Sequence, residues 1–391
     1  MTAGYHLNAL GLINALGRGR ATVAAGLFAG DQRGMCAMGG LLEGRRVMVG
    51  AVPGGLPEIP PALRRFDSRN NRMLLAAVLE IEAEIRAAIA KFGPGRVAVI
   101  LGTSTSGISD NEPGVAEKVR TGRFPEGFDY DRQDNASPSL FLRAYFELTG
   151  LAMTISTACT SSAKTLASAR RLIASGLVDA AIIGGADTLC RLTVNGFASL
   201  DLVADTLCNP FSKNRGGINI GEGAAVFLMS REPVGPRIAG IGESSDAYHM
   251  STPDPDGAGA FTAMRRALDE SGFAPADIAY LNLHGTATEL NDSMEAKAVH
   301  ELFGSVPCSS TKPLVGHTLG AAGSMELAFL YLALEAAGGE LPPHISDGAA
   351  DPDLPPLHLV AKGETAAHRR AMMSNSFAFG GSNISVILSN E

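Results

Sequence analysis

Short apolar runs alternate along the chain with longer stretches in which apolar residues recur every three or four positions. Helical periodicity covers residues 74–93, which we expect to end at Gly93, and residues 161–176, which end at a second glycine. Four other runs are nearly continuously apolar over the length of a strand: residues 96–104, 152–159, 179–187 and 224–232. Strands without a polar face belong to internal sheets, so this alternation predicts a layered α/β fold.

The pattern then restarts after a segment rich in proline and glycine at residues 232–240. Beyond it, helical periodicity returns at residues 261–273 and 324–339, with a strand at 278–288. Residues 154–176 and 308–338 share one layout, namely a strand end, a polar loop and a long helix that starts with small residues. This internal echo predicts two halves, 1–234 and 235–391, whose helix N-termini point toward one centre.

Composition narrows the class of protein. A chain of 391 residues with 46% hydrophobic residues can bury a large core, and a charged content of 18% disfavours disorder. The net charge of -8 disfavours a nucleic-acid binder, which needs concentrated Lys and Arg. No apolar run approaches the roughly 18 residues of a membrane span, and no signal peptide is recognised. Five scattered cysteines form no disulfide framework, so we expect a cytoplasmic protein without a membrane partner.

Cys159 lies in "STACTSSAKTL" (156–166), where a predicted strand meets a predicted helix. A helix N-terminus stabilises anions and lowers the pKa of a thiol, which would make Cys159 a nucleophile. The alternative is a buried inert thiol, because free cysteine is among the most buried residue types. The junction alone leaves both interpretations open.

Two histidines occupy similar junctions in the second half. His284 ends an apolar strand in "NLHGTATELND" (282–292), where Thr286 and Thr288 can hydrogen-bond an amide-bearing ligand. His317 precedes a small-residue helix in "STKPLVGHTLGAAGSMELAF" (310–329), and there Glu326 can pair with Lys312. Each histidine alone is compatible with a structural role. Three such junctions in one chain favour a catalytic site.

The glycine-rich stretch "NSFAFGGSN" (375–383) permits close backbone approach and exposed N–H groups after Phe379. Such groups can form an oxyanion hole, although an ordinary turn has the same composition. The chain contains no phosphate-binding loop, no H-E-x-x-H motif and no C-x-x-C pair. We therefore expect neither a nucleotide site nor a metal site.

Together these motifs resemble the signature regions of elongating β-ketoacyl-[acyl-carrier-protein] synthases of the thiolase superfamily, with "NPFSKNRGGINIGEGAAVFLMSRE" (209–232) as a fifth region. The likeness spans residues 96–391. It implies a five-layered α-β-α-β-α fold of two similar halves, usually in a homodimer, with a heterodimer as the alternative. It also implies an acyltransferase that condenses malonyl and acyl thioesters. No cofactor is expected, because the partner acyl carrier protein carries the phosphopantetheine arm.

By this resemblance each motif acquires a role. Cys159 is the acyl-accepting nucleophile, and its N–H and that of Phe379, also a gating residue, form the oxyanion hole. His284 and His317 promote decarboxylation of the malonyl group. The remaining matches are Lys312 and Glu326 in the same network, Thr286 and Thr288 on the pantetheine arm, and Ile108 in the acyl pocket.

Other interpretations of these motifs remain open. An initiating synthase would carry Asn where His317 stands, and a thiolase would carry a second late cysteine. A non-condensing partner subunit, which decarboxylates malonyl thioester or determines chain length, is the alternative function. Features such as "INALG" and "SRNNR" resemble synthases of aryl-polyene and related specialised pathways, with housekeeping fatty-acid elongation as the other option. A basic patch of Arg64, Arg65, Arg69 and Arg72 is expected to dock the acidic carrier protein, unless it is only a solvated loop.

Overall fold

The computed structural model describes residues 4–368 and 370–391, and its main sheet consists of two sets of strands. The first half contributes, in spatial order, β1 (His6–Asn14), β9 (Gly223–Ser230), β7 (Ala180–Asp187), β5 (Val97–Gly102) and β6 (Ala152–Ile155). The second contributes β10 (Arg237–Ser245), β15 (Ser382–Ser389), β14 (Ala371–Ala378), β11 (Ile278–Asn282), β12 (Pro307–Ser309) and the short β13 (His358–Leu359). The two sets meet where His6 of β1 pairs with Arg237 of β10.

Both sets have the same topology. In each, neighbouring strands among the first three are antiparallel, and the third and following strands are parallel to one another. Helix α6 (Ser161–Ala174) follows β6 in the first half, and α11 (Ala322–Glu335) follows β12 in the second. The predicted internal repeat is therefore confirmed at the level of strand order and direction.

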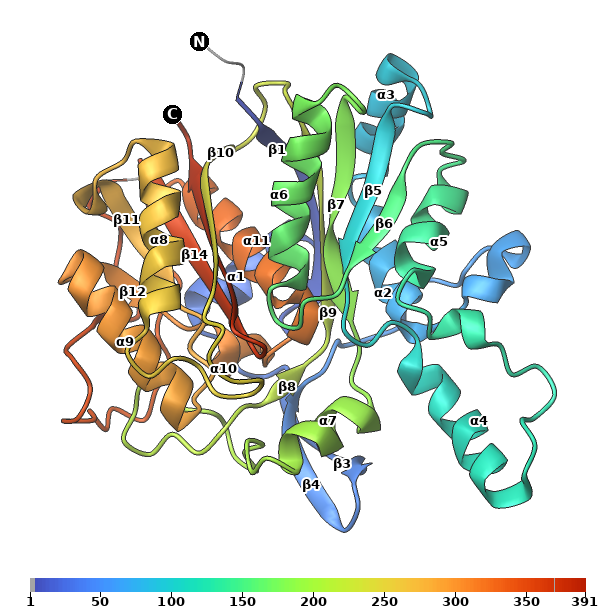
Figure 1. Cartoon of the computed structure of the whole chain (residues 1–391), viewed down its shortest axis with the longest axis horizontal. Coiled ribbons are helices and arrows are strands. Elements are labelled where there is room, and N and C mark those ends of the chain that lie inside the picture. The colour runs from blue at the N-terminus through green and yellow to red at the C-terminus, as the bar shows by residue number, and fades with distance from the viewer. Residues whose placement is uncertain (1–3, 369) are drawn as a thin grey trace.

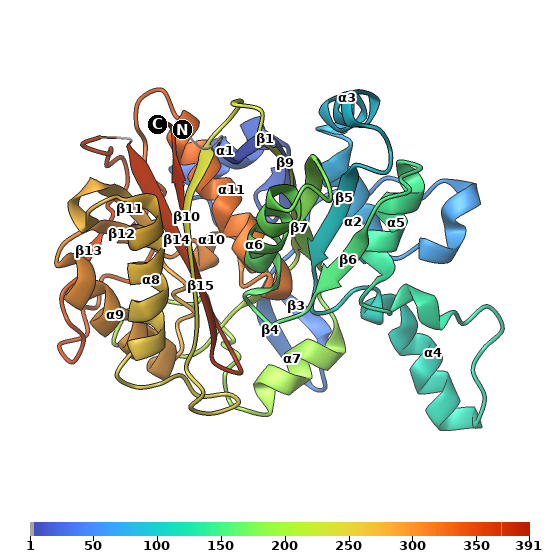
Figure 2. The same cartoon turned by 45° about the horizontal axis from the view of Figure 1, so that its top comes forward.

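Helices complete five layers. Helices α6 and α11 lie side by side between the two sets of strands, with α1 (Arg20–Ala29) packed in the same core (Figures 1 and 2). On one outer face lie α2 (Arg69–Val78), α3 (Glu82–Phe92) and α5 (Ser137–Tyr145), and on the other α8 (Ala258–Ser271) and α9 (Glu289–Phe303). Every residue of α11 except its last is buried, as expected for a helix with sheets on both sides. The predicted five-layered fold is confirmed.

Small residues allow the central helices to approach their neighbours closely. A Cβ placed on Gly323 of α11 would lie 2.6 Å from the Cβ of Ala163 in α6. A Cβ on Gly102, at the end of β5, would lie 2.3 Å from the backbone nitrogen of Ser162. The start of α6 is thus held against both the sheet and the other central helix.

The single helix predicted over residues 74–93 is wrong, because two helices occupy this stretch. Helix α2 ends at Val78 and α3 begins at Glu82. The apolar run 73–78 is buried on every side, whereas α3 buries only Ile85 and Ala88 among its eleven residues. One straight helix could not enter the core and then lie on the surface, so the chain breaks between them. The predicted end at Gly93 is confirmed.

Two further parts border the site. A small sheet of β3 (Met35–Leu42), β4 (Arg45–Gly50) and β8 (Ile220–Gly221) packs with α7 (Arg191–Ala198). Helix α4 (Ile108–Thr121) projects away from the body of the molecule (Figure 1). Within the described residues, no helix combines the length and the apolar character needed to cross a membrane.

Candidate active site

Cys159 lies in a tight turn between β6 and α6. Ala158, directly before it, has a φ of 51°, a left-handed conformation that is unusual for a residue with a Cβ. The side chain of Ser161 supports the turn, because its Oγ accepts a hydrogen bond from Thr157 N at 2.9 Å and donates to the Ala158 carbonyl at 2.5 Å. Cys159 itself is 6% exposed and lines a cavity. The sequence-predicted strand-to-helix junction is confirmed.

His317 comes from the second half and meets Cys159 directly. Its Nε2 lies 2.9 Å from Cys159 Sγ. Two hydrogen bonds hold the backbone of His317 against β8 and Asn219, the residue before that strand. The His317 N–H donates to the Asn219 carbonyl at 2.6 Å, and the His317 carbonyl accepts from Gly221 N at 2.8 Å. The backbone of His317 is therefore held against β8 of the small sheet.

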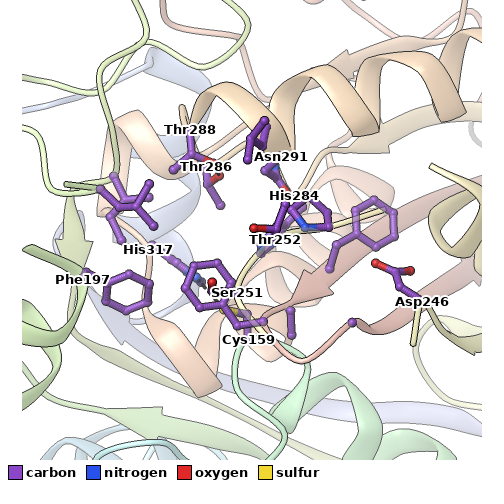
Figure 3. A pocket seen from close by; sticks show the side chains of 18 of the residues that line it. Cys159, Phe197, Asp246, Ser251, Thr252, His284, Thr286, Thr288, Asn291 and His317 are labelled. Atoms are coloured by element: carbon purple, nitrogen blue, oxygen red, sulfur yellow. Dashed lines mark hydrogen bonds between the residues drawn. The ribbon is translucent and has the colours of Figure 1, made fainter. Parts of the chain in front are cut away.

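His284 lies beside this pair, directly after β11. Its ring centroid is 5.4 Å from that of His317, with the two rings edge to face at 86° (Figure 3). The buried carboxylate of Glu295 holds the turn, because it accepts hydrogen bonds from His284 N at 2.8 Å and Gly285 N at 2.7 Å. The sulfur of Cys159 and one ring nitrogen each of His284 and His317 all lie within 4.8 Å of one another.

Burial determines the protonation of both histidines. Desolvation lowers the pKa of His284 and of His317 well below 6.5, and the nearby Lys312 cation lowers both further. Two neutral imidazoles can donate hydrogen bonds to a developing negative charge. Because they carry no full positive charge, they are poor acids toward a carbanion.

The lowered thiol pKa expected for Cys159 is wrong in this structure. Burial raises the pKa of Cys159 to about 12, although Lys312 favours the thiolate. Burial of the sulfur therefore outweighs the groups that favour the thiolate. Because His317 Nε2 lies within hydrogen-bond distance of Sγ, a neutral imidazole is available to accept the thiol proton.

Lys312 and Glu326 form the predicted ion pair, and they do so in the interior. Lys312 Nζ lies 2.5 Å from Glu326 Oε1, and both side chains are less than 5% exposed. The same ammonium group also donates to the carbonyl oxygen of His284. Desolvation raises the pKa of Glu326 and its partner opposes the rise. The pair thus connects α11 to the backbone of His284.

A cavity of about 240 Å³ opens onto these groups. Thr286 and Thr288 line it and share a hydrogen bond of 2.9 Å between their hydroxyl groups. Phe379 also lines it, in the turn between β14 and β15, and its ring packs 5.5 Å from that of Phe197 in α7. The predicted threonines and the glycine-rich turn therefore line the same cavity as Cys159. Figure 3 shows Thr286 and Thr288 across this cavity from Cys159.

Ile108 does not join this assembly. It is the first residue of α4, the helix that projects from the body, and it is not among the residues that line the cavity. Its place in an acyl pocket therefore stays a prediction.

The expected basic patch is only partly available. Arg69 binds the buried carboxylate of Glu222, and Arg72 binds Asp67 with N–O distances of 2.6 and 2.7 Å. Arg64 and Arg65 remain exposed, and the Arg65 guanidinium lies over the ring of Phe66 at 4.6 Å. Two of the four charges are thus neutralised by carboxylates of the fold, which corrects the prediction of a four-arginine patch.

Sequence reasoning missed several residues that shape the site. Glu295 lies on α9, eleven residues after His284, and shares the buried face of that helix with a second carboxylate, Asp292. Phe197 gave no signal, because α7 was not predicted. The loop from Asp246 to Pro253 lines another wall of the cavity and is tied to the glycine-rich turn by a bond from Gly380 N to the Met250 carbonyl.

Comparisons with known proteins agree with this geometry. Residues 49–234 match the family model "Beta-ketoacyl synthase, N-terminal domain", and residues 236–346 match "Beta-ketoacyl synthase, C-terminal domain". A 3-oxoacyl-[acyl-carrier-protein] synthase 2 of Coxiella burnetii is 35% identical over 263 residues, which cover 62% of this chain and 63% of the relative. Its counterpart from Staphylococcus aureus is 34% identical over 58% of this chain and 60% of the relative. The chain thus matches about three fifths of the length of these curated relatives.

Solved structures extend the likeness over the whole chain. The ketosynthase ApeO of Xenorhabdus doucetiae, determined in complex with its chain length factor ApeC, superposes with a TM-score of 0.94 at 44% identity and covers 99% of this chain and 98% of its own. The ishigamide ketosynthase/chain length factor gives a TM-score of 0.88 at 28% identity, covering 100% and 99%. With the family models matching most of its length, and with Cys159, His284 and His317 assembled as described, the chain belongs to the β-ketoacyl synthase family.

Proposed function

We propose that this protein is an elongating 3-oxoacyl-[acyl-carrier-protein] synthase. It would catalyse the decarboxylative Claisen condensation of malonyl thioester with an acyl chain bound to Cys159. The observation that carries the proposal is the contact of 2.9 Å between Cys159 Sγ and His317 Nε2, with a second neutral imidazole beside it. A nucleophile next to a base, with a second hydrogen-bond donor group facing the same cavity, suits acyl transfer followed by enolate formation.

In the first half-reaction, Cys159 Sγ attacks the thioester carbonyl carbon while His317 Nε2 receives the thiol proton. The backbone N–H groups of Cys159 and Phe379 hold the resulting oxyanion. Collapse of the tetrahedral intermediate breaks the bond to the carrier's sulfur, which leaves as a thiol with the proton returned by His317. One oxyanion donor of this kind typically contributes about 2.7–4 kcal/mol to transition-state stabilisation.

In the second half-reaction, malonyl thioester occupies the same cavity, with its pantetheine arm against Thr286 and Thr288. The bond to the carboxylate carbon breaks and carbon dioxide leaves, while His284 and His317 donate hydrogen bonds to the enolate oxygen. The carbanion attacks the acyl carbonyl on Cys159, and the Cys159 thiolate is expelled. Lys312 and Glu326 act indirectly, because Lys312 donates to the backbone carbonyl of His284 rather than to the reacting atoms.

The partners follow from this chemistry. The substrates are acyl and malonyl groups on an acyl carrier protein, whose phosphopantetheine arm replaces any cofactor of the synthase itself. The terminal strand β6 and the projecting α4 segment, with Val119 83% and Tyr130 63% exposed, supply a surface for a second subunit. The complex of ApeO with its chain length factor favours a heterodimer over the homodimer expected from the sequence. All five cysteines are free, which favours a reducing cytoplasm.

The same neighbour favours a specialised pathway. ApeO, a ketosynthase solved with a chain length factor, superposes over 99% of this chain, whereas the 3-oxoacyl-[acyl-carrier-protein] synthase 2 relatives align over 62% or less. We therefore propose aryl-polyene or related polyene biosynthesis, in which this subunit condenses and its partner determines chain length. The alternative function, a non-condensing subunit, fits less well, because this chain keeps Cys159 together with both histidines.

Mass spectrometry tests the proposal. The protein, with its partner subunit, is incubated with acyl-carrier thioesters of straight-chain, aromatic and polyene type, and then with malonyl-carrier protein. We expect an acyl adduct on Cys159 and a product two carbons longer, with both lost in Cys159→Ala. An unmodified Cys159, or condensation by Cys159→Ala, would refute the assignment. Malonyl decarboxylation without condensation in every complex would instead identify a non-condensing subunit.

A further inference from the structure

Asp187, the last residue of β7, has a fully buried side chain that takes no part in the proposed chemistry. No cation pairs with it among residues 4–368 and 370–391. Its carboxylate is surrounded by hydrogen-bond donors instead. Such a group has a structural or positioning purpose, because burying a carboxylate without partners is costly.

Five donors from two separate segments converge on this carboxylate. Oδ1 accepts from Thr103 Oγ1 at 2.8 Å, from Ser104 N at 2.8 Å, and from Thr105 N and Oγ1, both at 2.7 Å. Oδ2 accepts from Ala321 N at 3.0 Å. An ionised carboxylate satisfies this arrangement because it only accepts. An amide in its place would direct its NH₂ group at a donor in either orientation.

The two segments belong to different halves of the molecule. Residues 103–105 follow β5 in the first half, while Ala321 closes the turn Leu319–Ala321 that separates His317 from α11. This turn is constrained, because Leu319 has a φ of 52° and a Cβ on Gly320 would lie 2.8 Å from Asp187 Oδ2. Such a conformation persists only where its surroundings enforce it.

The turn Leu319–Ala321 restrains the segment that carries His317. Upstream of the imidazole, Asn219 and Gly221 hold the His317 backbone. Downstream, Ala321 N donates both to the Thr318 carbonyl within the turn and to Asp187 Oδ2, each at 3.0 Å, and Ser324 N donates to Ser162 Oγ at 2.8 Å. Asp187 therefore ties the His317 segment to the half of the molecule that carries Cys159.

We propose that Asp187 is a positioning residue for the contact between His317 and Cys159, holding the turn after His317 against the first half of the fold. This inference rests on the proposed function, in which His317 accepts the proton of Cys159. A displacement of about 1 Å between reacting groups can lower a rate by about 100-fold. Asp187 thus acts through His317 and touches no substrate.

The test is a double-mutant cycle on the alkylation of Cys159 by iodoacetamide, which needs no substrate. Asp187→Asn, His317→Ala and the double variant are compared with the wild type at one pH, and alkylation of Cys159 is followed by mass spectrometry. We expect Asp187→Asn to slow alkylation about 10-fold and to have no further effect when His317 is already alanine. Condensation by Asp187→Asn should show a lower kcat with KM nearly unchanged.

The loss of the Asp187 charge and the mispositioning of His317 should change the alkylation rate in opposite directions. Burial raises the pKa of Asp187, while its hydrogen bonds from Thr103, Ser104 and Thr105 oppose the rise. The charge that Asp187 carries contributes to the raised pKa of Cys159, so the loss of that charge alone would favour thiolate and speed alkylation. Faster alkylation, or an equal slowing with and without His317, would overturn the inference. If the wild type alkylates as expected and the cycle holds but no condensation occurs, the proposed function fails while the positioning role stands. If condensation occurs and the cycle is additive, only the inference fails.

Matched variants control for stability. Asp179→Asn changes the same residue type next to the opposite end of β7, in a surface pair with Arg96, and should leave alkylation unchanged. Tyr280→Phe removes a buried hydroxyl that is hydrogen-bonded to Ser309 at 2.6 Å, and it shows the effect of general destabilisation. Should Asp187→Asn fail to fold, Thr105→Val removes one donor from the same carboxylate and enters the same cycle. Equal slowing by Thr105→Val in both backgrounds then overturns the inference.

Discussion

Phe197 and Phe379 pack their rings against each other, with 5.5 Å between centroids and an angle of 46°, in the wall of the cavity that contains Cys159. Phe197 belongs to α7 in the first half, and Phe379 to the turn between β14 and β15 in the second. The turn that supplies the proposed oxyanion donor is therefore held by a side chain from the other half. Such an aromatic pair contributes about 0.5–1.5 kcal/mol beyond simple burial.

Replacement of Phe197 by alanine should release Phe379 from this wall. We expect Phe197→Ala to decarboxylate malonyl thioester without prior acylation about 2- to 10-fold faster than the wild type, the range that corresponds to the lost ring contact. The ratio of carbon dioxide released to product formed measures this uncoupling. Leu192→Ala on the same helix, where the side chain is 61% exposed, is the control. An unchanged ratio in Phe197→Ala would mean that the ring contact does not restrain Phe379.

The free energy of unfolding should depend on Lys312 and Glu326 being present together. Lys312→Met leaves the Glu326 carboxylate buried without a cation, which typically costs about 3–5 kcal/mol of unfolding free energy. The double variant Lys312→Met with Glu326→Leu removes both charges and should recover most of that loss. Denaturant unfolding compares the two variants with the wild type. Equal stability of the single and double variants would contradict the pairing.

Activity separates the two roles of Lys312. The double variant also lacks the bond from Lys312 to the His284 carbonyl, so its decarboxylation rate should stay low even though its stability returns. Recovery of both properties would show that Lys312 acts on the fold alone.

The two histidines should make the protein sensitive to acid. Their pKa values are well below 6.5 in the fold and return to about 6.5 in the unfolded chain, so the unfolded state binds more protons below that pH. The free energy of unfolding should therefore fall as the pH decreases below about 6.5, and these two groups should not affect it above that pH. Because Glu295 and Glu326 titrate with the opposite sign, the comparison is between the wild type and the variant His284→Asn with His317→Asn.

The double histidine variant should lose less stability than the wild type between pH 6.5 and lower values. Urea unfolding at a series of pH values gives the difference directly. Parallel curves for the two proteins would indicate that the histidines are protonated in the fold. The rate of malonyl decarboxylation by the wild type should likewise show no acid limb near pH 6.5.

The arginines near α2 should divide into two kinds. Arg65→Glu should raise KM for carrier-bound substrates and leave small thioester substrates unchanged, because its exposed charge is free to meet an acidic carrier protein. Arg69→Glu should lower Tm instead, because it places a carboxylate against the buried Glu222. Arg265→Glu on α8 controls for net charge. Equal effects of Arg65→Glu on both substrate types would argue against docking at this surface.

Local patterns predicted much of the framework. Continuous apolar runs identified β5, β7 and β9, and glycines identified the ends of α3 and α6, because each signal arises within a few neighbouring residues. The break between α2 and α3 was missed, since the apolar periodicity continues through it and only packing distinguishes a buried segment from a surface one. The motif order likewise identified Cys159, His284 and His317 as partners before any distance was known.

The sequence by itself therefore determined the parts of the protein. These are two similar halves, a cysteine and two histidines at strand-to-helix junctions, and a glycine-rich turn. Tertiary structure decided how these groups behave. Burial raised the pKa of Cys159, and the folded chain paired Arg69 with Glu222. Folding also brought Asp187 and Phe197 to the site from segments distant in sequence from His284 and His317. Solvation and contact depend on residues distant in sequence, and no local pattern contains them.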